Sequence, residues 1–186
     1  HVYASLKVTI SFNKSKINQE IRLYRGLPLV YFVTEIEWHE KGTPDVSAPM
    51  LKVAFPVNIT TDKVTCEIPF GFIERLVDGR EIPALKWVDI SEKNCGVSLL
   101  NDCKYGHDIQ GNVIRLTLLR SAYEPDLNPD EGLHRIVYAL YPHAGGWKRA
   151  KTVRHGYELN MPLISVLKNP RNNAPKLPDI ISFVEI

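Results

Sequence analysis

Apolar and polar residues alternate with a period of two along much of the chain. Such alternation is typical of strands with one buried face. The alternating runs are residues 6–12, 30–38, 51–57, 64–70, 85–87, 113–119 and 134–141. We predict a strand in each run.

Two of these runs are apolar on both faces, which indicates strands in the interior of a sheet. They are residues 113–119 and residues 134–141, and Pro142 is expected to end the second one because proline donates no backbone hydrogen bond. Residues 180–186 repeat the strand pattern at the end of the chain. We expect the native chain to continue beyond them, although a terminal strand docked in a sheet is an equally good interpretation.

Turn residues separate the runs, and no segment carries an i, i+3, i+4, i+7 apolar stripe over three turns. The best helix candidates are the short stretches 72–77 and 130–134. Short strands divided by glycine and proline predict an all-β fold, an antiparallel β-sandwich with few short helices. With no internal repeat, we interpret residues 1–186 as a single β-sandwich domain.

The composition fits a globular domain and argues against two partner classes. The 186 residues are 44% hydrophobic and 24% charged, with a net charge of +2 and scattered basic residues. A nucleic-acid or membrane partner is therefore not expected. The three cysteines are odd in number and widely spaced, which favours a reducing, cytoplasmic setting, with one disulfide and a spare thiol as the alternative.

A search for catalytic chemistry yields no self-contained site. No H-x-x-x-H or His-x-Asp zinc signature occurs, so no metal is expected in this chain. Asp102, Asp108, Asp126 and Asp130 lie in loop-like segments where turn-capping aspartate is common.

Two further candidates are best interpreted as bystanders. The pair His107-Asp108 is better explained as an exposed polar turn than as a ligand set. Ser98 lacks the glycine that would complete a nucleophile elbow and reads as a strand residue.

An ordered series of short motifs resembles the C-terminal portion of glycoside hydrolase family 38, the α-mannosidases, above all the bacterial and archaeal type. The motifs are WHE (38–40), LKVAFP (51–56), EIPFG (67–71) with ER (74–75), PALKWVD (83–89), LLNDCKYG (99–106), LLR (118–120) and YPH (141–143). Thinner similarity reaches residues 17–24 and 160–162, so the resemblance covers most of the chain.

The resemblance implies a retaining, zinc-dependent exo-mannosidase whose zinc and nucleophile lie in an N-terminal α/β barrel. It also implies that this chain is a supersandwich-like, galactose-mutarotase-like fragment of the larger enzyme, lacking that barrel. We therefore expect the chain alone to be inactive. Its expected partner is the catalytic barrel of the same enzyme, and through that barrel a mannoside substrate. Homo-oligomers are also expected where the fragment exposes apolar surface.

One loop is the best candidate for contact with sugar. Asn101, Asp102, Lys104 and Tyr105 combine a carboxamide, a carboxylate, an ammonium and an aromatic ring after a predicted strand. The alternative is that Asn101 and Asp102 only build a turn. An independent carbohydrate-binding module is the alternative function, with Trp147, Tyr105 and Tyr157 as its candidate platform. Core or interdomain packing is the better explanation of Trp147.

Overall fold

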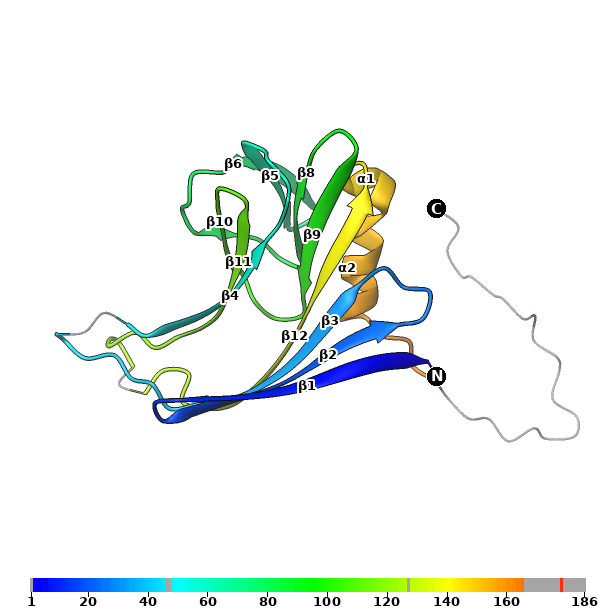
Figure 1. Cartoon of the computed structure of the whole chain (residues 1–186). Coiled ribbons are helices and arrows are strands. Elements are labelled where there is room, and N and C mark those ends of the chain that lie inside the picture. The colour runs from blue at the N-terminus through cyan, green and yellow to red at the C-terminus, as the bar shows by residue number, and fades with distance from the viewer. Residues whose placement is uncertain (1, 46–47, 127, 166–177, 179–186) are drawn as a thin grey trace, which may run out of the picture.

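Two antiparallel sheets and two short helices form the described part of the chain, residues 2–45, 48–126, 128–165 and 178 of a computed structural model (Figure 1). The larger sheet has eight strands in the order β1 (Tyr3–Phe12), β2 (Ser15–Tyr24), β3 (Val30–Trp38), β12 (Gly132–Ala144), β9 (Cys95–Asn101), β8 (Trp87–Ser91), β5 (Lys63–Ile68) and β6 (Gly71–Leu76). The smaller sheet has the order β4 (Met50–Pro56), β11 (Val113–Arg120), β10 (Gly106–Gln110) and β7 (Ile82–Pro83).

The main core lies between the two sheets. Strands β3, β8, β9 and β12 turn every second side chain toward the smaller sheet, where β10 and β11 do the same. Aromatic rings join the layers. The ring of Phe32 in β3 stacks on that of Tyr138 in β12, with centroids 5.1 Å apart, and lies 5.2 Å from the ring of Phe55 in β4 of the smaller sheet. Burial of this apolar surface is the main force that holds the sandwich together.

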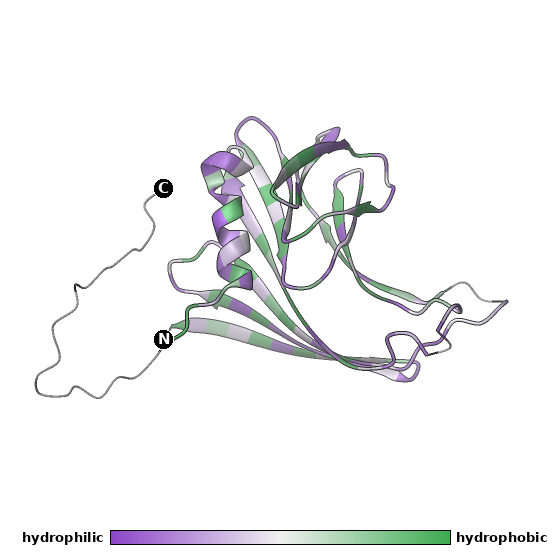
Figure 2. Cartoon of the chain, turned by 180° about the vertical axis from the view of Figure 1, so that it is seen from behind, coloured by the Kyte–Doolittle hydropathy of each residue, from purple (hydrophilic) through white to green (hydrophobic). Residues whose placement is uncertain are grey.

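Helices α1 (Trp147–Ala150) and α2 (Thr152–Asn160) cover part of the opposite face of the larger sheet (Figures 1 and 2). A second apolar cluster lies beneath them, around Trp87, Leu100 and Tyr141. The Tyr141 hydroxyl donates a 2.9 Å hydrogen bond to the carbonyl of Ala150. The described chain therefore has three layers over the middle of the larger sheet.

The predicted all-β antiparallel sandwich is confirmed, and each predicted strand that falls within the described residues overlaps a strand of the structure. The two apolar runs are interior strands, since β11 lies between β4 and β10 and β12 lies between β3 and β9. The predicted strand at residues 180–186 lies outside the described residues.

Three expectations about the elements were wrong. Residues 72–77 fall largely in β6, which pairs with β5 as a hairpin, and residues 130–134 lead into β12. Pro142 does not end β12, which continues to Ala144. Pairing of β12 with β3 stops at Leu140, so Pro142 lies where β12 has a single neighbouring strand and a proline is tolerated.

Candidate functional site

The loop at residues 101–105 joins β9 of the larger sheet to β10 of the smaller one, and Asn101 builds its first turn. The Asn101 side chain is buried, donates to the Leu85 carbonyl at 3.0 Å, and accepts from the backbone N–H groups of Cys103 and Lys104 at 3.1 and 2.6 Å. Such side-chain bonds to the following backbone fix a turn. Asn101 therefore positions the loop with its own carboxamide.

Asp102, another predicted residue of this loop, is held against β12 through Val137. Asp102 accepts a 3.0 Å hydrogen bond from the Val137 backbone N–H through one carboxylate oxygen. Desolvation by the surrounding protein, and then the Asp102 side chain, raise the pKa of the Cys103 thiol to about 12. Cys103 is therefore a protonated thiol at neutral pH and a poor nucleophile.

The loop borders a hollow of about 240 Å³ that also contacts Lys86 and the last residue of α2, Asn160. The Asn160 amide donates to the Asn101 carbonyl at 3.0 Å, which holds the end of α2 against the loop. The Tyr105 ring is 62% exposed beside this hollow. The structure thus brings the four predicted residues to one concave surface; contact with sugar stays a prediction.

A buried polar cluster beneath α2 escaped the sequence analysis, although Ser98 is, as predicted, a strand residue. The His143 ring nitrogen Nε2 lies 2.8 Å from an Asp89 carboxylate oxygen and 3.1 Å from the Ser98 hydroxyl, which also contacts the Thr152 hydroxyl at 2.8 Å. The other ring nitrogen, Nδ1, lies 3.0 Å from the Gly145 carbonyl.

This cluster has the composition of a catalytic triad without its geometry. In a triad the aspartate and the serine contact opposite nitrogens of the histidine, whereas here both contact Nε2. Asp89, Ser98 and Thr152 are also closed to solvent. The cluster joins α2 to β8, β9 and β12, and its members are too far apart in the sequence to be recognised as a group.

His107 and Asp108 do not form the exposed turn that was expected, because both are buried in β10. Asp108 is ion-paired with Lys52 at 2.6 Å and with Arg115. His107 has an unpartnered Nε2 among the described residues, and burial lowers its pKa to about 4. Alternation along β10 points the two side chains to opposite faces.

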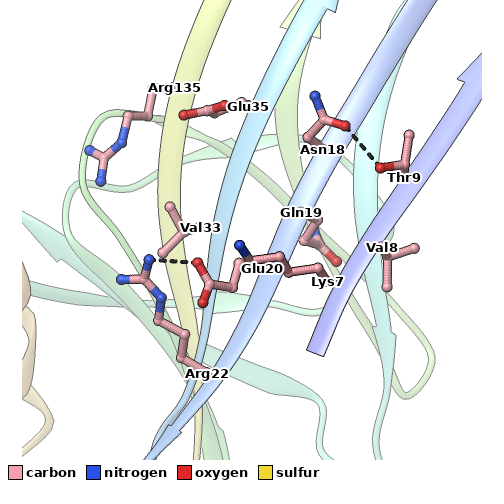
Figure 3. Close-up of a pocket in the computed structure, with 10 residues that line it drawn as sticks. All are labelled: Lys7, Val8, Thr9, Asn18, Gln19, Glu20, Arg22, Val33, Glu35 and Arg135. Atoms are coloured by element: carbon pink, nitrogen blue, oxygen red, sulfur yellow. Dashed lines mark hydrogen bonds and ion pairs between the residues drawn. The ribbon is translucent and has the colours of Figure 1, made fainter. Parts of the chain in front are cut away.

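A second hollow, of about 430 Å³, crosses β1, β2, β3 and β12 (Figure 3). Charged side chains of opposite sign line it, with Arg22 paired to Glu20 at 2.7 Å and Glu35 in register with Arg135. The hydrogen bond from Arg22 lowers the pKa of the Glu20 carboxyl. No aromatic ring is among the residues that line this hollow. Its polar and charged lining is typical of the solvated face of an antiparallel sheet.

The predicted aromatic platform is not one surface. Trp147 packs against the rings of Phe72 and Trp87, with centroids 4.6 and 5.2 Å apart, so packing explains it. Tyr105 and Tyr157 border different hollows. Across the described ranges, no three His, Cys, Asp or Glu side chains gather closely enough to hold a metal ion, and no helix is long and apolar enough to cross a membrane.

Comparison with known proteins identifies the class of this sandwich. A family model described as "Glycosyl hydrolases family 38 C-terminal domain" matches residues 1–128. The chain is 39% identical over 160 residues to mouse "Alpha-mannosidase 2C1" and 41% identical over 147 residues to a Saccharomyces cerevisiae "Alpha-mannosidase". These alignments cover 82% and 75% of this chain. The chain belongs to the C-terminal domain family of the family 38 glycosyl hydrolases.

The same comparisons set the scale of the relatives. The alignments span only 15% of the mouse protein and 13% of the yeast protein. A crystal structure of a family 38 protein from Enterococcus faecalis shares the fold with a TM-score of 0.69, at 18% identity, over 80% of this chain and 18% of that one. The chain therefore corresponds to a small part of much longer proteins.

Proposed function

We propose that this chain is a non-catalytic β-sandwich portion of an α-mannosidase that hydrolyses terminal α-mannosides. In this role the sandwich supports a separate catalytic barrel, and zinc binds in the barrel. A cytoplasmic setting fits the three free cysteines, Cys66, Cys95 and Cys103.

The observation that carries the proposal is the alignment of most of this chain with about one seventh of named α-mannosidases. The residue chemistry supports it. Glycoside hydrolysis generally requires two carboxyl groups that flank the bond. Several carboxylates are already engaged elsewhere: Asp89 in the buried cluster, Asp108 in ion pairs and Asp126 in a turn.

The loop at residues 101–105 gives the sandwich a means to touch the substrate of the barrel. Asp102, Lys104 and Tyr105 offer an acceptor, a donor and an apolar ring at one concave surface. Asn101 fixes the loop that carries them. We place the contact with mannoside here.

Two measurements test the proposal. The purified chain is assayed with an aryl α-mannoside, with and without added divalent metal, and no turnover is expected. Turnover that is lost in Asp102→Asn would contradict the non-catalytic role. The coding sequence upstream of His1 is determined in parallel, and a barrel with a His-x-Asp zinc motif is expected there.

A further inference from the structure

A third hollow, of about 300 Å³, lies beside the β5–β6 hairpin, next to the hollow of the 101–105 loop. Four aromatic side chains line it together with Glu67, namely Phe70, Phe72, Trp87 and Tyr157. Lys86 lies between these two hollows. It lines the hollow of the 101–105 loop, and its Nζ lies 3.1 Å from a carboxylate oxygen of Glu67, which lines the third hollow. We propose that this third hollow binds one neutral pyranose residue of an oligosaccharide.

The strained and exposed conformation of Phe70 is the first feature that points to a ligand. Pro69 and Phe70 form the two-residue turn between the paired residues Ile68 and Gly71. Phe70 has a φ of 60°, in the left-handed region that favours glycine, and its side chain is 110% exposed. The described chain thus gains no burial that would offset the backbone strain, and such uncompensated strain is characteristic of functional positions.

The charge of the hollow favours a neutral ligand. Glu67 is buried, with one carboxylate oxygen accepting from the Lys86 backbone N–H at 2.6 Å and the other from Lys86 Nζ. The Lys86 ammonium also lies 4.6 Å from the centre of the Tyr157 ring. The two charges balance each other, while the carboxylate keeps free lone pairs and the ammonium keeps free protons.

The polar and apolar groups together match a sugar. A pyranose presents an apolar C–H face, which packs on aromatic rings, and hydroxyls that both donate and accept. The hollow offers the rings, the Glu67–Lys86 pair and Trp87, whose indole N–H is buried with no acceptor among the described residues.

The subsite is tested by titrating the ¹⁵N-labelled chain with methyl α-mannoside and with neutral manno-, gluco- and galacto-disaccharides. At least one sugar is expected to shift the Trp87 indole signal saturably. Phe70→Gly should weaken this binding about tenfold, the scale of one lost aromatic contact. Leu133→Ala, which removes another exposed apolar side chain, should leave it unchanged.

Three results would overturn the subsite. The first is that no sugar produces a saturable shift. The second is that Tyr105→Ala weakens sugar binding and Phe70→Gly does not, which would assign the sugar to the 101–105 loop. The third is loss of self-association, without loss of sugar binding, in Phe70→Gly, which makes the hairpin a protein-docking element. These readouts are separate from the hydrolysis assay, so the subsite and the proposed mannosidase role can fail independently.

Discussion

Phe70 combines a left-handed backbone with a fully exposed ring, and this combination has a measurable consequence for stability. Relief of the strain in Phe70→Gly is worth about 1–2 kcal/mol, offset by the greater freedom that glycine has in the unfolded chain. We expect a net gain of about 1 kcal/mol in the free energy of unfolding, measured by urea denaturation. Phe72→Gly is the matched control and should destabilise the chain, because Phe72 is a strand residue packed on Trp147.

His107 predicts a pH dependence of stability. Burial lowers its pKa to about 4, whereas the unfolded chain titrates it near the ordinary value of 6.5. Between these values the unfolded state binds the proton and the folded state does not, so stability is retained above pH 6.5 and lost as the pH falls toward 4. The loss attributable to His107 is about 2 kcal/mol between pH 7 and pH 5.

His107→Leu should remove this part of the acid sensitivity. The free energy of unfolding of both proteins is measured with urea at pH 7 and at pH 5. The drop from pH 7 to pH 5 should be about 2 kcal/mol smaller in His107→Leu than in the wild-type chain. Parallel pH profiles would mean that His107 is protonated equally in the folded and unfolded chains.

The sequence indicated which residues form the polar loop at 101–105, but not which of their side chains turns inward and which face the hollow. An asparagine, an aspartate, a lysine and a tyrosine within five residues indicate a polar loop. In the structure the Asn101 side chain turns inward and fixes the loop through hydrogen bonds. Which side chain turns inward depends on the carbonyl of Leu85 and the end of α2, which are distant in sequence. The Asp89–Ser98–His143 cluster was invisible for the same reason.

At the scale of elements, α2 depends on a close approach to the sheet at Gly156. A Cβ atom at this position would lie 3.0 Å from Trp87 Cδ1, closer than ordinary packing allows. Gly156→Val should therefore push the helix from the sheet and destabilise the chain by about 1–3 kcal/mol, measured by urea unfolding. Gly146→Val is the control, since among the described residues no atom beyond its two chain neighbours lies within 4 Å of its Cβ position, and its effect should stay within about 0.5 kcal/mol.

Gly156 also explains why strands were predicted more successfully than helices. The strands bury one face and keep the period of two, which the sequence displays directly. The helix α2 buries only Thr152 and Gly156, so it has no apolar stripe at helical spacing. Conversely, the stretch 72–77 was a wrong helix candidate, because its hairpin pairing with β5 is a tertiary property.

The two sheets of the sandwich differ in extent. The smaller sheet has four strands and the larger has eight, so part of the larger sheet's core-side face has no strand of the smaller sheet over it. Leu6 and Ile10 of β1 pair in register with Ile21 and Ile17, and Ile17 pairs with the core residue Ile36. The apolar face of β1 therefore continues the core face of the sheet, yet Leu6 and Ile10 are 61% and 51% exposed.

This uncovered face, on an edge strand with unpaired backbone groups, predicts self-association of the isolated chain. Sedimentation velocity should show a concentration-dependent increase in mass, and Leu6→Glu with Ile10→Glu should suppress it, because two charges on this face oppose its burial. The control is Thr9→Glu with Ser11→Glu, which adds the same charge to the opposite face of β1. Equal suppression by both pairs would assign the effect to net charge, and a monomeric wild-type chain at every concentration would show that the exposed face of β1 is not adhesive.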